Sequence, residues 1–128
     1  MTESQRILIV AEDASRRKSM IRALEHSKLW VESAASCEAA NRQLLDGRFA
    51  AVVIDLTSSL EAIELIKRIR ATHEPGETGV LVIGEWGTGR PALALSHGAD
   101  AYEPGPIDEQ HLLDSLERVL CPHAVVVE

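Results

Sequence analysis

The sequence of 128 residues is poor in aromatic side chains, cysteine and long apolar segments. Aromatic residues make up 3% of the chain, so Val, Ile, Leu and Ala must build most of the core. The two cysteines, Cys37 and Cys121, lack metal-ligand spacing and are interpreted as ordinary thiols of a cytoplasmic protein. The apolar runs are far shorter than the roughly 20 residues that cross a bilayer. The first residues, MTESQR, have no apolar core of a signal peptide.

The sequence also has fewer basic than acidic residues. Lys and Arg number 13 against 20 Asp and Glu, and the net charge is −7. This balance argues against direct binding of nucleic acid or of an anionic membrane. The five histidines are scattered and predict no metal site. A hydrophobic content of 45% fits a globular protein, and we expect one domain with a core over about residues 6–120 and a tail over 121–128.

Short apolar runs alternate with segments of helical spacing along the chain. The runs that predict strands lie at residues 7–10, 30–35, 50–54, 80–83 and 101–102. The helices are expected around Met20 to Leu24, at 37–46 after Ser36, after the capping pair Ser58 and Glu61, at 91–97, and from near Ile107, with Leu112, Leu113, Leu116 and Leu120 buried in the last. Strands alternating with helices predict an α/β fold with a mostly parallel sheet covered on both faces.

Acidic residues follow two of the predicted strands. Glu12 and Asp13 come after the first strand, and Asp55 ends the third. Each has an ordinary interpretation, since Asp13 can cap a helix, Glu12 can be solvated and Asp55 can simply end a strand. If the two strands are neighbours, three carboxylates meet at one edge of the sheet and repel one another. Such hard oxygen ligands suit Mg²⁺.

Four segments carry a resemblance to a known family. They are Ile-Leu-Ile-Val-Ala-Glu-Asp at 7–13, Val-Val-Ile-Asp-Leu at 52–56, Gly-Ala-Asp-Ala-Tyr at 98–102, and Pro106. Together they resemble the receiver domain of bacterial two-component response regulators, and the resemblance runs from about residue 6 to residue 120. It implies a flavodoxin-like, doubly wound sheet of five parallel strands in the order 2-1-3-4-5, with five helices.

The resemblance also implies a function and its residues. Asp55 would accept a phosphoryl group from a histidine kinase or phosphotransfer protein. Mg²⁺ would be held by Glu12, Asp13, Asp55 and the backbone carbonyl of Thr57. A cis peptide bond is expected between Gly105 and Pro106. The family further implies a homodimer through the fourth helix, fifth strand and fifth helix, with Tyr102 on that signalling face.

Three positions depart from the receiver pattern. Gly84 stands where receivers carry a Thr or Ser that binds the phosphoryl group, and Gly105 stands where they carry a Lys. The loop at 57–60 lacks the usual Met-Pro and Gly. The positive charge of the missing lysine could be replaced in space only by another residue, such as Lys18 or Arg90. Loss of a fixed electrostatic donor slows such chemistry about 10²–10³-fold. The sequence therefore leaves open a phosphorylatable receiver and a pseudo-receiver that acts by protein contacts alone.

A third function from another class remains open. The glycine-rich loop from Gly84 to Gly89 follows a strand and precedes a helix, so its amides could bind an anion or a nucleotide. It matches neither the P-loop nor the dinucleotide-binding pattern. Ser58 and Ser59 have no positioned histidine, and Cys37 lies in a predicted helix, so we expect no enzyme with a serine or cysteine nucleophile.

Overall fold

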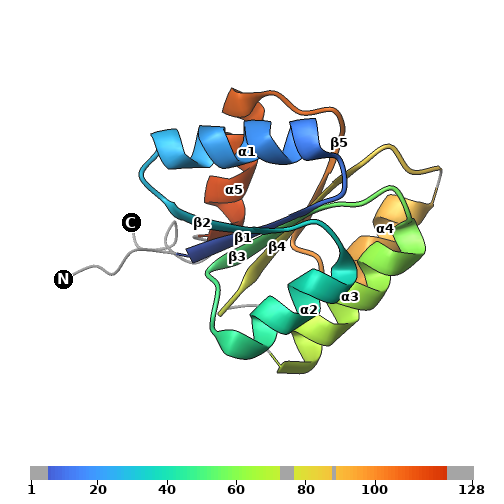
Figure 1. Cartoon of the computed structure of the whole chain (residues 1–128). Coiled ribbons are helices and arrows are strands. Elements are labelled where there is room, and N and C mark those ends of the chain that lie inside the picture. The colour runs from blue at the N-terminus through green and yellow to red at the C-terminus, as the bar shows by residue number, and fades with distance from the viewer. Residues whose placement is uncertain (1–5, 73–76, 88, 121–128) are drawn as a thin grey trace, which may run out of the picture.

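A computed structural model describes residues 6–72, 77–87 and 89–120 of the chain. The predicted tail at 121–128, with Cys121, lies outside the described residues. The elements follow one another as β1 (Arg6–Ala11), α1 (Ala14–His26), β2 (Trp30–Ala34), α2 (Cys37–Asp46), β3 (Ala51–Asp55), α3 (Ser59–Thr72), β4 (Gly79–Gly84), α4 (Arg90–Ser96), β5 (Ala101–Pro104) and α5 (Glu109–Leu120) (Figure 1). The strands are parallel in the order β2-β1-β3-β4-β5, which confirms the predicted sheet.

Helices cover both faces of the sheet, with α1 and α5 on one face and α2, α3 and α4 on the other (Figure 1). Alternation along the strands divides the core between the two faces. On β3, Val53 packs with α1 and α5, whereas Val52 and Ile54 pack with α2, α3 and α4. The strand residues 7–10, 51–54 and 80–83 are buried, as expected for central strands covered on both sides.

Side-chain caps begin the helices largely where the sequence predicts them. Ser36 accepts a hydrogen bond from the Ala39 amide at 3.1 Å, and Ser58 accepts one from the Glu61 amide at 3.2 Å. The last helix differs from the prediction. It begins at Glu109 rather than near Ile107, because the Asp108 carboxylate accepts the His111 amide at 2.8 Å and caps it.

Burial of the last helix also corrects the prediction. Leu112 and Leu116 are buried, but Leu113 and Leu120 are only partly so. Of the described residues, no helix combines the length and apolar character that a bilayer crossing requires.

An arginine–aspartate pair holds the amino end of β4. Arg70 on α3 donates to the Asp100 carboxylate at 2.7 Å and to the carbonyl oxygens of Thr78 at 2.7 Å and Gly98 at 2.8 Å. The same carboxylate oxygen of Asp100 accepts the Val80 amide at 2.8 Å. This network ties α3 to the residue before β4 and to the segment that leads into β5.

Candidate functional site

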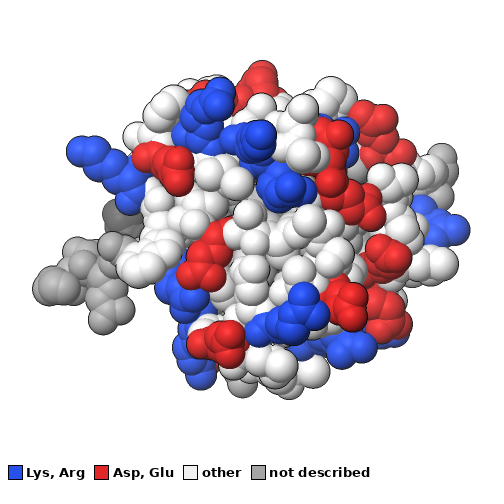
Figure 2. Space-filling model, viewed as in Figure 1, with Lys and Arg blue, Asp and Glu red and all other residues white. Residues whose placement is uncertain are grey.

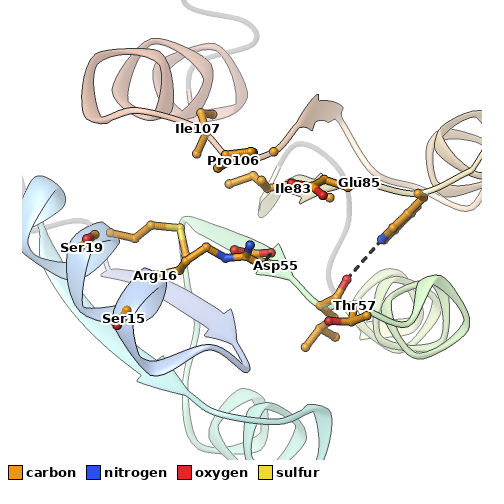
Figure 3. A pocket seen from close by; sticks show the side chains of 14 residues that line it. Ser15, Arg16, Ser19, Asp55, Thr57, Ile83, Glu85, Pro106 and Ile107 are labelled. Atoms are coloured by element: carbon orange, nitrogen blue, oxygen red, sulfur yellow. Dashed lines mark hydrogen bonds and ion pairs between the residues drawn. The ribbon is translucent and has the colours of Figure 1, made fainter.

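A pocket of about 380 Å³ opens at the carboxyl ends of the strands. Its walls come from the first turns of α1, the ends of β3 and β4, and the loop between β5 and α5 (Figure 3). Ligand sites of doubly wound sheets lie at this edge, near the change in strand order. Here that change is at β1 and β3, which are hydrogen-bonded neighbours with Ala11 opposite Asp55.

Asp55 lies at the centre of this pocket, directed toward α1 (Figure 3). It follows Val53 at the two-residue spacing of a strand, so its side chain leaves the sheet on the face covered by α1 and α5. Its side chain is 6% exposed, and Arg16 on the first turn of α1 donates to Oδ1 at 2.9 Å. Arg16 itself is 45% exposed. The predicted phosphoacceptor is therefore already paired with a cation of this chain.

The Asp55 carboxylate accepts one hydrogen bond from the described residues. Arg16 donates to Oδ1, and Oδ2 is open to the pocket without a donor among these residues. Burial raises the pKa of Asp55 above its ordinary value, and the charge and hydrogen bond of Arg16 offset this only in part. Asp13 and Glu12 raise the pKa a little further through their negative charge.

The other two predicted carboxylates are used by the backbone. Glu12 accepts the Thr57 amide at 3.0 Å, and Asp13 accepts the Arg16 amide at 2.8 Å as the cap of α1. The described residues contain no group of three His, Cys, Asp or Glu side chains placed to hold a metal ion. As arranged here, these donors do not fit Mg²⁺, and no role for Thr57 beyond its amide is seen.

Trp86 occupies the space beside Gly84, where receivers place a hydroxyl. A Cβ added to Gly84 would lie 2.6 Å from the indole Nε1. The indole donates to the Leu56 carbonyl at 3.2 Å and thereby joins the end of β4 to the end of β3. A side chain at position 84 and the indole of Trp86 in this place therefore exclude each other.

Tyr102 is held against the same structure. Its hydroxyl donates to the Gly84 carbonyl at 2.6 Å and accepts the Trp86 amide at 3.3 Å. The two aromatic rings lie 5.4 Å apart at a tilt of 51°. Tyr102 is thus a half-buried side chain with two hydrogen bonds to the end of β4.

The loop after β5 contributes shape and no charge to the pocket. The Gly105–Pro106 bond is cis, as predicted, and the Gly105 amide donates to the Gly84 carbonyl at 2.9 Å. Gly105, Pro106 and Ile107 all line the pocket. No lysine lines the described pocket, and the position of the expected ammonium is a backbone without a side chain.

Arg16 is the functional residue that sequence reasoning missed. We expected Lys18 or Arg90 to replace the lysine, but Arg90 donates to the Ser59 hydroxyl at 3.0 Å and neither residue lines the pocket. The signal that would have identified Arg16 is its place three residues after Asp13. The third residue of a helix that starts at a sheet edge lies one turn in, near the ends of neighbouring strands.

The glycine-rich loop gains no support as an anion site. Glu85 places a negative charge there, and α4, which follows, has only seven residues. Gly89 has a φ of 88°, which accounts for one of its glycines by backbone conformation. Thr88 lies outside the described residues.

Comparison with solved structures supports the fold. The chemotaxis response regulator CheY4 of Vibrio cholerae superimposes with a TM-score of 0.82 at 22% identity, over 91% of this chain and 99% of that one. A CheY-like receiver domain protein from Methanospirillum hungatei gives 0.85 at 24%, over 94% and 96%. An orphan response regulator of H. pylori gives 0.81 at 20%, over 91% and 97%. No protein-family model matches the chain. The chain therefore has the CheY-like receiver fold.

Proposed function

We propose that this chain is a receiver-type domain of two-component signalling that acts through protein contacts while Asp55 remains unphosphorylated. The observation that carries the proposal is the 2.9 Å pair between Arg16 and Asp55. A guanidinium bound to the nucleophilic oxygen lowers its reactivity toward phosphorus. The receiver fold of the whole described chain, together with the similarity to response regulators, supports the signalling role.

The surroundings of Asp55 also disfavour a phosphoryl group. Its transfer needs cations or hydrogen-bond donors around three equatorial oxygens. Here Gly84 and Gly105 provide no side chain, and Arg16 is the only cation among the described lining residues. Glu85 adds a negative charge to the same pocket wall. A dianionic group would therefore be poorly stabilised.

Phosphoryl acceptance at Asp55 from a histidine kinase or phosphotransfer protein is the second candidate. The feature that favours it is the carboxylate at the end of β3, with Oδ2 free of protein donors in the described structure and lining an open pocket. Dimerisation through α4, β5 and α5 stays a prediction, because neither the single chain nor the comparisons support it.

Amide NMR of the isotope-labelled chain separates the two candidates. We expect Mg²⁺ followed by beryllofluoride, an aspartyl-phosphate mimic, to leave the amides of Asp55 and Tyr102 unmoved. Shifts that spread from Asp55 to Tyr102, and vanish in an Asp55→Asn control, would overturn the proposal in favour of phosphoryl acceptance.

A variant that restores the receiver pattern provides a matched test of the cause. Trp86→Ala combined with Gly84→Thr and Gly105→Lys opens space for a hydroxyl and supplies an ammonium. If these absences block the site, this variant responds to beryllofluoride while the natural chain does not. A dispersed amide spectrum of the variant confirms that it folds.

A further inference from the structure

The pocket above Asp55 has the size and lining of a small-molecule site. Its volume of about 380 Å³ lies near the lower end of the roughly 300–1,000 Å³ typical of ligand pockets. Met20, Ile83, Pro106 and Ile107 are apolar lining residues, and Figure 3 shows the last three together on one side of the Arg16–Asp55 pair. Apolar walls with a few converging polar groups are the usual composition of such sites.

Part of the space is open because position 105 lacks a side chain. Gly84 and Gly105 both line the pocket, and the space beside Gly84 is taken by Trp86. Trp86 is tied to the Leu56 carbonyl, so its indole forms a fixed wall at the far side.

The charges of the pocket determine what it can accept. Among its described lining residues, Asp55 and Glu85 are acidic and only Arg16 is basic. Arg16 contacts Oδ1, and no protein donor in the described structure contacts Oδ2, which is open to the pocket. A carboxylate oxygen in a partly enclosed pocket is stabilised by an N–H donor, most of all by a charged one. An anion could contact Arg16 but would lie beside the two carboxylates, Asp55 and Glu85.

We propose that this pocket binds a small organic cation, an ammonium or amidinium group carried on a compact apolar body. Its N–H groups donate to Oδ2 of Asp55, and its apolar part packs against Met20, Ile83 and Pro106. The proposal goes beyond the proposed function, since it gives the receiver fold a chemical input that needs no phosphoryl transfer. On the face shown in Figure 2, side chains of both signs occur, and acidic ones are more frequent toward the right of the view.

Three probes of one shape and different charge test the proposal. Benzamidine is a cation, benzamide is neutral and benzoate is an anion. We expect benzamidine to shift the amide signals of Gly84, Glu85 and Ile107 in the full chain and to bind more tightly than benzamide. We expect no measurable binding of benzoate. Binding of benzoate equal to that of benzamidine, or shifts confined to other surfaces, would overturn the proposal.

Variants locate the contact. Asp55→Asn is expected to lower the affinity for benzamidine about tenfold or more, because a charge-assisted hydrogen bond is lost. The affinity for benzamide is expected to change little. Arg16→Gln is expected to raise the affinity for benzamidine, because it removes the guanidinium that competes for Asp55. An equal loss for all probes in Asp55→Asn contradicts the charge argument. A response to beryllofluoride would overturn the proposed function. The titration with the three probes would still test the cation proposal, because it does not depend on phosphoryl transfer.

Discussion

Two arginine–aspartate pairs lie at opposite ends of the sheet, and they differ in how completely their groups are bonded. At the amino end of β4, the Asp100 carboxylate accepts both Arg70 and the Val80 amide, and Arg70 also donates to two backbone carbonyls. At the carboxyl end of β3, Asp55 receives Arg16 alone among the described residues. The Arg70–Asp100 pair therefore connects parts of the fold. The Arg16–Asp55 pair instead leaves a carboxylate oxygen facing a pocket without a protein donor.

The difference follows from where each carboxylate lies. Asp100 lies beside the Val80 amide and the Arg70 guanidinium, so its Oδ2 accepts two hydrogen bonds from the protein itself. Asp55 lies at the strand edge where ligand sites form, and its neighbours Gly84 and Gly105 provide no donor side chain. Incomplete bonding of a buried charge costs stability, and proteins concentrate such costs at functional sites.

The largest expected effect is the loss of the structural pair. Arg70→Met removes donors to Asp100 and to two carbonyls, so we expect the free energy of unfolding to fall by about 3 kcal/mol. Urea denaturation measures it. Arg22→Met, at an exposed position of α1, is the matched control, and we expect it to change the free energy of unfolding by no more than about 0.5 kcal/mol. Equal losses in both variants would show that the Arg70 network contributes nothing special.

The Arg16 pair should be worth less. Arg16→Met removes one charge-assisted hydrogen bond from a side chain that is 45% exposed, so we expect a loss of about 1–2 kcal/mol. In an Asp55→Asn background the same change should cost close to nothing, because no buried charge is left unpaired. A double-mutant cycle in urea measures the coupling, and additive losses would argue against the ion pair.

One substitution should act with opposite sign at the two ends. Asp100→Asn removes the charge from a carboxylate that accepts two hydrogen bonds and should destabilise the fold by about 1 kcal/mol or more. Asp55→Asn relieves a desolvated, half-bonded carboxylate and should stabilise it by about 0.5–1 kcal/mol. Thermal unfolding of the two variants beside the natural chain measures both signs. Destabilisation by Asp55→Asn would mean that the pair with Arg16 outweighs burial.

The smallest effect is a dependence on pH. Burial raises the pKa of Asp55 in the folded chain above its ordinary value of about 3.9. Between these two values the folded state binds more protons, so stability falls as pH rises through this window and is constant above it. The difference between the natural chain and Asp55→Asn, measured by urea unfolding from pH 3.5 upward, isolates this contribution. A difference that does not vary with pH would contradict the raised pKa.

Much of the fold could be predicted because its signals are local. The strand runs, the caps Ser36 and Ser58, and the alternation of strands with helices are short-range patterns, and the structure confirms them. The start of α5 was predicted too early because the Asp108 cap was not recognised. The placement of Asp55 at the end of a central strand was correct for the same local reason.

The contacts inside the pocket could not be predicted in this way. Arg16 and Asp55 are 39 positions apart, and their meeting depends on how α1 lies over β1 and β3. Trp86 reaches the Leu56 carbonyl across 30 positions, and in this place its indole occupies the space that a side chain at position 84 would need. Residue types alone indicated a missing hydroxyl and ammonium without indicating what takes their place.

For this protein, then, the order of residues determined the strands, the helices and the end of β3 at which Asp55 stands. It did so because periodicity, capping and burial act between residues close in the chain. Tertiary structure alone decided which cation pairs with Asp55, which of its oxygens is left without a donor, and which side chain fills the space beside Gly84. Those outcomes depend on distances between elements that no local pattern encodes.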